Sequence, residues 1–152
     1  MPNNRVLVAD DNVELAETVA DILADDGFDV AVVSSGTQAL ITWRKRPSDL
    51  VVLDVDLPDI DGLTIARRLS RRPQGCGLVV MSARDPEVLV PRCDELGARF
   101  LPKPFGPTHL LDAVRAMLEE RIRRAASASQ RIALRLLGPR TPRALLDQFR
   151  RR

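Results

Sequence analysis

Four consecutive apolar residues, Leu50 to Leu53, lead directly into Asp54. After Asp54 the chain turns through a cluster of proline and acidic residues that ends at Gly62. A short, uninterrupted apolar run bounded by turn residues is typical of a strand buried on both faces of a parallel sheet. Ligands of open α/β sheets bind at the carboxyl ends of such strands. The pattern therefore predicts that Asp54 lies at a ligand-binding edge.

The sequence alternates five times between strand and helix patterns. Apolar runs predict the strands, at residues 5–9, 28–33, 50–54, 77–81 and 99–101. Helical spacing of apolar residues predicts a helix after each strand. The fourth helix should be kinked at Pro91 or begin there, and end at Gly97, because proline within a helix removes one backbone hydrogen bond. This alternation indicates an α/β fold with helices on both faces of a parallel sheet.

The order of the strands decides which residues meet. Right-handed crossovers and one reversal after the first strand give the order 2-1-3-4-5, a flavodoxin-like (βα)5 doubly wound sheet. In this order Asp10 and Asp11, at the end of the first strand, flank Asp54 on one side. Ser82 flanks it on the other side, and Lys103 approaches from the end of the fifth strand. Polar side chains from four strands are thus expected at one edge.

The chemistry of these side chains points to phosphoryl transfer. Carboxylates crowded together resist being ionised at the same time, so such a cluster ordinarily requires a cation, most plausibly Mg2+. Asp54 is then the candidate nucleophile toward phosphorus. Lys103 can balance the charge of one phosphoryl oxygen, and the Ser82 hydroxyl can donate to another.

Charge divides the chain into two parts. Residues 1–118 hold 13 Lys or Arg and 18 Asp or Glu, whereas residues 119–152 hold 10 Arg and 3 acidic residues. We expect a folded domain over residues 4–120 and a basic, helical tail over residues 121–152. The tail would extend the last helix through a heptad-like seam made of Leu118, Ile122, Ala125, Ser129, Ile132 and Leu136. A short second helix is expected after Thr141 and Pro142.

Other features of the sequence limit the environment of the protein. No apolar run is long enough to cross a bilayer and no signal segment precedes the first strand, so we expect a cytoplasmic protein with no membrane contact. Cys76 and Cys93 lack metal-ligand spacing and should be reduced thiols. His109, the one histidine, should be exposed near a helix start and bind no metal.

Four short motifs in order resemble one family. They are Asp10-Asp11, Asp54 followed by Leu57-Pro58-Asp59-Ile60-Asp61-Gly62, Ser82-Ala83, and Lys103-Pro104-Phe105. Each is weak alone, but together they resemble the response-regulator receiver domain of two-component signalling, the CheY-like family. The resemblance covers roughly residues 4–120.

The resemblance implies a phosphorylation switch rather than an enzyme, with autophosphatase activity at most. Asp54 would take a phosphoryl group from a phosphohistidine on a sensor histidine kinase or histidine phosphotransfer protein. Asp11 would hold Mg2+ directly, Asp10 would assist through water, and Asp56 would contribute its backbone carbonyl.

The resemblance also implies how the signal leaves the site. Ser82 and Phe100 would form a switch pair, in which Phe100 turns inward when Ser82 moves toward the phosphoryl group. Lys103-Pro104 would be a cis peptide. The surface of the fourth helix, the fifth strand and the fifth helix would then bind a downstream protein or a second copy of the chain.

Asp56 and Arg84 are two residues beyond Asp54 and Ser82, so both should rim the pocket. An ion pair between them could act as a gate that hinders the water that hydrolyses the acyl phosphate, or it could be a surface pair of little energy.

Other functions remain open at this point. Asp54-Val55-Asp56 also matches the first motif of haloacid-dehalogenase-like Mg2+ phosphatases. Those enzymes are expected to start with the nucleophile strand, whereas here the acid pair at residues 10 and 11 precedes it. A degenerate receiver used only for docking is a third alternative. The basic tail could bind DNA, support a dimer or pack on the domain, but about 30 residues are too few for a usual winged-helix output domain.

Overall fold

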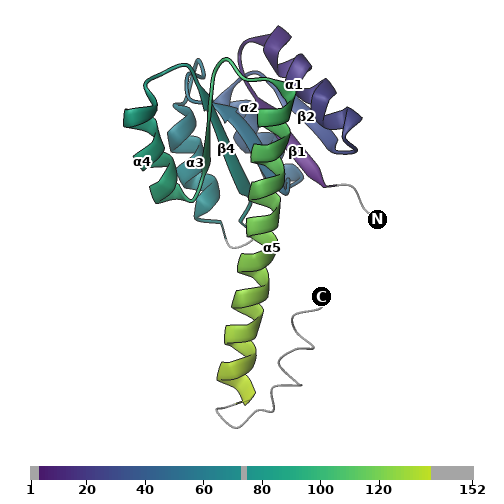
Figure 1. The fold of residues 1–152 in the computed structure, drawn as a ribbon, viewed down its shortest axis with the longest axis vertical. Helices are drawn as coiled ribbons and strands as arrows, with labels where there is room; N and C mark the ends of the chain where they lie inside the picture. The colour runs from purple at the N-terminus through teal and green to yellow at the C-terminus, as the bar shows by residue number, and fades with distance from the viewer. Residues whose placement is uncertain (1–3, 73–74, 138–152) are drawn as a thin grey trace. The chain divides into compact units, whose positions relative to one another are not determined.

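The computed structural model describes residues 4–72 and 75–137 (Figure 1). Strands and helices alternate throughout, as predicted. The elements are β1 (Arg5–Ala9), α1 (Val13–Asp25), β2 (Asp29–Val33), α2 (Gly36–Lys45), β3 (Leu50–Asp54), α3 (Gly62–Ser70), β4 (Gly77–Ser82), α4 (Pro86–Leu96), β5 (Arg99–Pro102) and α5 (Pro107–Leu137). The strands form one sheet in the order β2-β1-β3-β4-β5, and all their pairings are parallel. The predicted doubly wound fold is therefore confirmed.

Strand β3 lies at the centre of the sheet, and all five of its residues are buried. Its register with the neighbouring strands aligns their carboxyl ends: Leu53 pairs with Ala9, and Asp54 pairs with Met81. Asp10 and Ser82, which follow these partners, therefore come to the same edge as Asp54. The hydrophobic run that predicted the strand is also what delivers Asp54 to this edge.

The two faces of the sheet are covered by different helices (Figure 1). Helices α2, α3 and α4 pack on one face in a core that includes Trp43, Ile65 and Leu89. Helices α1 and α5 pack on the other, in a core that includes Leu23 and Leu110. Each fully buried side chain of this size contributes about 1.5–3 kcal/mol of hydrophobic stabilisation. The edge that carries Asp54 is thus built on a sheet packed on both sides.

Helix α4 decides where the fourth helix begins. It begins at Pro86, so a start at Pro91 is wrong; Pro91 lies inside the helix, which ends before Gly97 as predicted. Pro86 suits the first turn because the amide that it lacks would have no partner within the helix. The Asp85 side chain caps this start by accepting a hydrogen bond from the Glu87 amide at 2.9 Å. Leu89 and Cys93 are buried on either side of Pro91, and their packing offsets the lost backbone bond.

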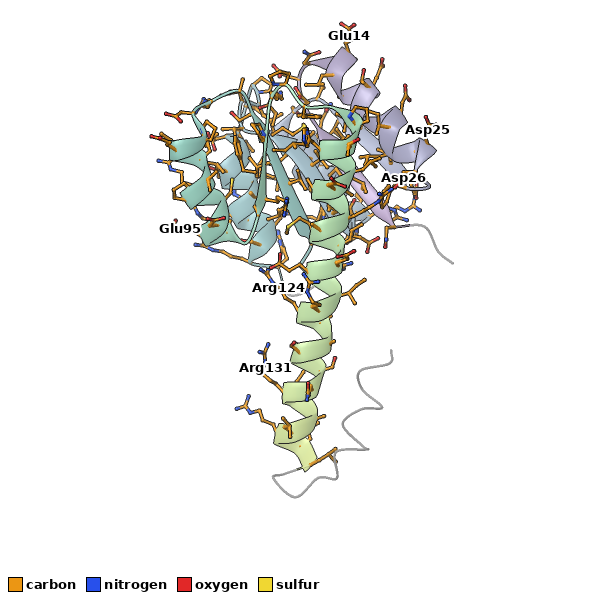
Figure 2. All side chains as sticks on the ribbon, in the orientation of Figure 1. Glu14, Asp25, Asp26, Glu95, Arg124 and Arg131 are labelled. Atoms are coloured by element: carbon orange, nitrogen blue, oxygen red, sulfur yellow. The ribbon has the colours of Figure 1, made fainter. Side chains whose placement is uncertain are left out.

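The chain divides into two compact units, residues 1–118 and 119–152. In the second unit the helix is described as far as Leu137, so the extension predicted through Leu136 is present. Its seam residues Ile122, Ile132 and Leu136 are 68%, 58% and 80% exposed. Arg124 and Arg131 project from the same helix (Figure 2). The short helix predicted after Thr141 lies outside the described residues.

Neither α5 nor any other helix in residues 4–72 and 75–137 combines the length and hydrophobicity that a membrane span requires.

Candidate functional site

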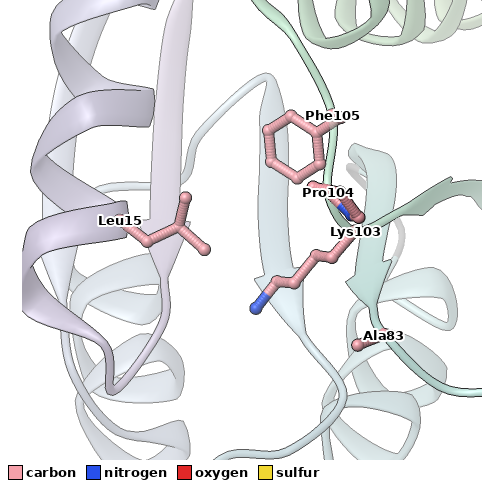
Figure 3. Close-up of a pocket in the computed structure, with 5 residues that line it drawn as sticks. All are labelled: Leu15, Ala83, Lys103, Pro104 and Phe105. Atoms are coloured by element: carbon pink, nitrogen blue, oxygen red, sulfur yellow. The ribbon is translucent and has the colours of Figure 1, made fainter.

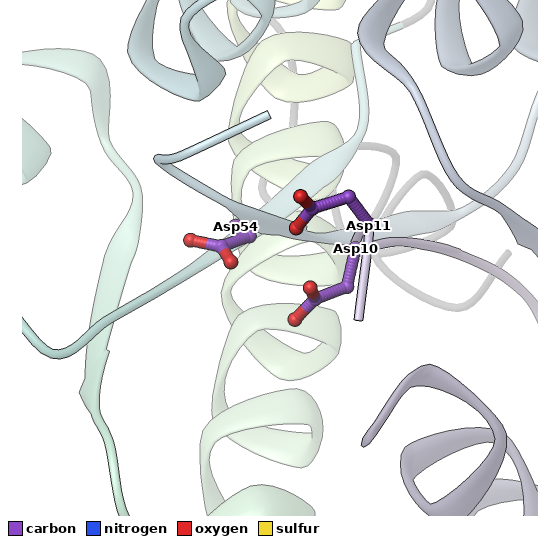
Figure 4. A group of neighbouring side chains, drawn as sticks. All are labelled: Asp10, Asp11 and Asp54. Carbon is purple, nitrogen blue, oxygen red and sulfur yellow. The ribbon is translucent and has the colours of Figure 1, made fainter. Parts of the chain in front are cut away.

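Three aspartates meet at the carboxyl edge of the sheet (Figure 4). One carboxylate oxygen from each of Asp10, Asp11 and Asp54 lies within 4.8 Å of the corresponding oxygens of the other two. Asp10 is fully buried, Asp54 is 6% exposed and Asp11 is exposed. The cluster therefore has two carboxylates in the interior and one at the solvent boundary.

The two buried carboxylates are fixed in the same way. Asp10 Oδ1 accepts a hydrogen bond from the Asn12 amide at 2.9 Å, and Asp54 Oδ1 accepts one from the Asp56 amide at 3.0 Å. In each case the amide belongs to the second residue after the aspartate, where the chain turns at the end of its strand. One oxygen of each carboxylate is thereby held by backbone, which leaves Oδ2 for other partners.

Lys103 contacts both remaining oxygens. Its Nζ lies 3.0 Å from Asp10 Oδ2 and 2.9 Å from Asp54 Oδ2. The lysine is placed by the end of β5, where its amide donates to the Ser82 carbonyl at 2.9 Å. The following Lys103-Pro104 peptide is cis, as expected. A single ammonium therefore bridges two carboxylates that come from β1 and β3.

Burial and hydrogen bonding oppose each other within this cluster. Burial raises the pKa of Asp10 above its ordinary value of 3.8, although hydrogen bonds from Asn12 and Lys103 pull it down. Burial disfavours the charge on Lys103, but its hydrogen bonds to Asp54 and Asp10 outweigh burial and raise its pKa. One ammonium for three carboxylates leaves the cluster net negative.

A hard divalent cation fits this donor set. Such ions take oxygen ligands, and the three clustered carboxylates supply several oxygens at one side of the Lys103 ammonium. Mg2+ in particular is commonly bound by one or two carboxylates together with water and phosphate oxygens.

Ser82 lies at the end of β4 and is 1% exposed. Its Oγ accepts a hydrogen bond from the Arg84 amide at 3.0 Å. The Arg84 guanidinium in turn pairs with the Asp56 carboxylate across the rim, with side chains 57% and 51% exposed. The structure thus brings together the two rim residues that their spacing in the sequence singled out.

An apolar hollow of about 310 Å³ lies next to Lys103 (Figure 3). Its lining combines Lys103 with Leu15, Ala83, Pro104 and Phe105. Leu15 was not predicted as a site residue, because helical spacing identifies only the buried stripe of α1. One feature of the sequence could have identified it: Leu15 is an apolar residue of α1 that lies outside the buried stripe and only a few residues after Asp10 and Asp11.

Phe100 lies on β5, opposite Val80 of β4. It is half-buried against the core that α2, α3 and α4 share with the sheet. A second hollow, of about 350 Å³, is lined by residues including Phe100, Arg99, His109 and Asp112. Phe100 therefore packs against this core and also lines a hollow that residues of β5 and α5 share.

Comparison with known proteins agrees with this geometry. Residues 6–115 match the response regulator receiver domain family. The DNA-binding response regulator MtrA of Mycolicibacterium paratuberculosis (strain ATCC BAA-968 / K-10) is 42% identical over 115 residues, which are 75% of this chain and 51% of that protein. MtrA of Mycobacterium leprae (strain TN) matches to the same extent. The chain thus spans about half the length of the curated relatives it matches.

Solved structures show the same fold. The chemotaxis response regulator CheY4 of Vibrio cholerae aligns over 76% of this chain and 98% of its own, with a TM-score of 0.69 and 24% identity. NtrX from Brucella abortus aligns over 96% of this chain and 33% of its own, with a TM-score of 0.75 and 25% identity. With its parallel sheet, its acidic edge and a family match that covers most of the first unit, the chain belongs to the receiver domain family of response regulators in two-component signalling.

Proposed function

We propose that Asp54 is a phosphoacceptor and that the domain is a switch with autophosphatase activity at most. The observation that carries the proposal is the Lys103 ammonium placed between Asp10 and Asp54, with Asp11 beside them. When bound, Mg2+ would neutralise the carboxylates and stabilise the charge on a transferring phosphoryl group. Asp11 and Asp54 would hold it through carboxylate oxygens, Asp10 would assist through water, and Asp56 would contribute its backbone carbonyl.

The reaction transfers one phosphoryl group from a phosphohistidine to Asp54. An oxygen of the Asp54 carboxylate forms a bond to phosphorus, and the bond between phosphorus and the imidazole nitrogen breaks. The electron pair of that bond stays on the imidazole, which then takes a proton. Lys103 balances the charge of a phosphoryl oxygen, and the Ser82 hydroxyl, whose oxygen accepts from the Arg84 amide, donates its own proton to another. The products are an acyl phosphate and a neutral histidine.

The donor would be a sensor histidine kinase or a histidine phosphotransfer protein. The hollow beside Lys103 supports this part of the proposal, because its apolar lining suits the side chains and the imidazole ring of a partner protein. Leu15 and Phe105 lie on opposite sides of this hollow (Figure 3). Such an encounter would take place in the cytoplasm.

Output would pass through Ser82 and Phe100 to the surface of α4, β5 and α5. Phe100 is suited to this role because it lies between the inner core and the hollow at that surface. Its inward rotation would change the shape of the hollow, which a downstream protein or a second copy of the chain would read. The exposed seam of residues 122–136 offers a second dimerisation element, and arginines elsewhere on the same helix offer contacts to DNA.

The pair of Asp56 and Arg84 would act as a gate over the phosphorylated residue. It spans the rim between the β3–α3 loop and the end of β4. Water must reach the acyl phosphate to hydrolyse it, so a closed pair would lengthen the lifetime of the phosphorylated state.

The test is the intact mass of the protein after incubation with a small acyl-phosphate donor and Mg2+. The expected result is a single added phosphoryl group that requires Mg2+, persists after the donor is removed and is absent in Asp54→Ala. Asp61→Ala, which removes another carboxylate of the β3–α3 loop, is the control and should label normally. Steady release of phosphate over many turnovers would instead favour a phosphatase, and no labelling by any phosphohistidine donor would favour a docking domain.

A further inference from the structure

Asp59 connects the loop between β3 and α3 to the beginning of α2. Its Oδ1 accepts a hydrogen bond from the Gly36 amide at 2.7 Å, and its Oδ2 accepts one from the Thr37 amide at 2.8 Å. The Thr37 hydroxyl donates to the same Oδ2. Asp59 Oδ1 also accepts from the amide of Ile60, the next residue, at 2.9 Å. Both oxygens of one carboxylate are therefore engaged by a helix that lies more than 20 residues earlier in the chain.

The beginning of α2 has a physical need for this carboxylate. The first amides of a helix have no partner within the helix, and they carry partial positive charge. The Ser35 side chain, which caps α2, accepts from the Gln38 amide, at 3.2 Å. Asp59 therefore supplies the hydrogen-bond acceptors that the amides of Gly36 and Thr37 lack within the helix. The hydrogen bonds from Thr37 and Gly36 lower the pKa of Asp59 well below its usual range, so the carboxylate is charged at all physiological pH values.

The same contact is closely packed. A Cβ atom added at Gly36 would lie 2.7 Å from Ile65 Cδ1 and 2.9 Å from Ile60 Cβ. These distances are shorter than real Cβ contacts, so the start of α2 touches both the loop and α3 without a gap. Asp59 therefore belongs to a fixed joint between α2, α3 and the loop, although its side chain lies at the surface.

This joint bears on the acidic cluster because of what else the loop carries. The Asp56 amide holds Asp54 Oδ1, and the Asp56 carbonyl is the backbone ligand in the proposed function. At the far end, the Gly62 amide returns to the Val55 carbonyl at 2.9 Å. A Cβ at Gly62 would lie 2.1 Å from the Asp54 carbonyl oxygen, so the loop closes tightly on the strand end. Asp59 ties the middle of this loop to a separate helix.

We infer that Asp59 is a positioning residue for the cation site, because it fixes the loop that presents the Asp56 carbonyl by holding it to the start of α2. The inference rests on the proposed function for the identity of the cation, Mg2+. Groups that orient metal ligands from outside the ligand set typically change metal affinity by 10–100-fold when they are lost. Because the joint includes the amides of Gly36 and Thr37, the coupling must also run in the opposite direction, and cation binding should stabilise those two amides.

The experiment measures Mg2+ affinity of the full chain by titration calorimetry, together with the thermal unfolding midpoint. Asp59→Ala should weaken Mg2+ binding about tenfold. Asp59→Asn, which keeps one acceptor oxygen, should weaken it less, and it remains informative if the alanine variant folds poorly. Asp85→Ala is the matched control, because Asp85 is also an exposed aspartate that caps a helix start, but the helix that it caps is α4 rather than α2. It should leave Mg2+ affinity within about twofold of wild type.

Amide hydrogen exchange provides a readout that does not depend on phosphorylation. In the wild type, Mg2+ should slow exchange at Gly36 and Thr37, and in Asp59→Ala both amides should exchange fast with or without Mg2+. Equal Mg2+ affinity in Asp59→Ala, Asp85→Ala and the wild type would overturn the inference and leave Asp59 as a helix cap. A wild type that binds no Mg2+ would overturn the proposed cation site as well, so the two failures are distinguishable.

Discussion

Two sets of ionic contacts lie at the same edge of the sheet, and they differ in burial. The side chains of Lys103, Asp10 and Asp54 are 19%, 0% and 8% exposed. Those of Arg84 and Asp56 are 57% and 51% exposed. Buried ions lose hydration that their mutual attraction does not always repay, whereas exposed pairs are worth little. Neither set is therefore expected to contribute much to the stability of the fold, and under the proposed function they would do different work: the buried set would serve phosphoryl transfer and the exposed pair would control access.

The largest expected effect comes from removing the lysine of the buried set. Lys103→Met leaves two buried carboxylates without a cation, and in Mg2+-free buffer this should lower the free energy of unfolding by about 3 kcal/mol. Phosphorylation by a small acyl-phosphate donor should slow by at least about 100-fold, because a charge that stabilises the transition state is lost. Urea unfolding and time-resolved intact mass measure the two effects.

Lys45→Met, which changes an exposed lysine of α2, is the control for charge alone and should alter neither quantity. If Lys103→Met changes the free energy of unfolding by less than about 0.5 kcal/mol, the carboxylates are hydrated and the contrast between the two sets disappears.

The next largest effect is expected at Asp11, whose carboxylate is exposed although it belongs to the acidic cluster. In the wild type, Mg2+ at 100 times its Kd should add about 2.7 kcal/mol to the free energy of unfolding. Asp11→Asn should remove most of that increase, because it deletes a proposed direct ligand, yet it should cost little stability without Mg2+. Asp21→Asn, at another exposed acid of α1, should keep the full increase. Equal responses of the two variants to Mg2+ in thermal unfolding would show that Asp11 is not a ligand.

Much of this site follows from the sequence because strand ends are easy to locate. Apolar runs of a few residues predict buried strands, and a parallel order then brings the residues after those runs to one edge. For this reason the sequence alone predicts that Asp10, Asp54, Ser82 and Lys103 lie together, and the structure places them at that edge. The strand order could be predicted without knowledge of any side-chain contact.

Contacts between loops could not be predicted in this way. Asp59 lies in a loop with no periodic pattern and Thr37 lies in the first turn of α2, so nothing in the sequence pairs them. Leu15 lines the hollow beside Lys103 only because α1 and the β5–α5 loop are neighbours in space. The start of α4 was uncertain because Pro86 and Pro91 give opposing local signals, which tertiary packing of Leu89 and Cys93 resolves.

A smaller effect concerns Asp10, and the question is whether ionisation of its buried carboxyl group stabilises or destabilises the fold. Because burial raises the pKa of Asp10 in the folded protein, ionisation of this group opposes folding, and stability is lost as pH rises above the ordinary value of 3.8. Asp10→Asn cannot ionise, so at pH 7 without Mg2+ it should be more stable than the wild type by about 1 kcal/mol. The difference should vanish at pH values below 3.8, where the carboxyl is protonated in both states. Urea unfolding at several pH values measures it, and a loss of stability at pH 7 would show that the bond to Lys103 outweighs burial.

The smallest effect on stability is expected for the exposed pair, where the kinetic effect is the informative one. Arg84→Ala should change the free energy of unfolding by less than about 0.5 kcal/mol, because both partners are hydrated. If the pair hinders water, the lifetime of phosphorylated Asp54 should shorten about fivefold, which corresponds to a barrier lower by about 1 kcal/mol. The decay of the phosphorylated mass after donor removal measures this lifetime.

Variants of the partner decide whether Arg84 acts through the pair. Asp56→Ala keeps the backbone carbonyl assigned to the proposed cation site but removes the carboxylate, so it should shorten the lifetime as much as Arg84→Ala. The double variant should decay no faster than either single variant, because one interaction cannot be lost twice. Arg92→Ala, at an exposed arginine of α4, should decay like the wild type. If the lifetime in Arg84→Ala matches that in Arg92→Ala, the pair of Arg84 and Asp56 is a surface contact without a role in hydrolysis. Burial would then distinguish the two sets of contacts at this edge: the buried set would be functional and the exposed pair incidental.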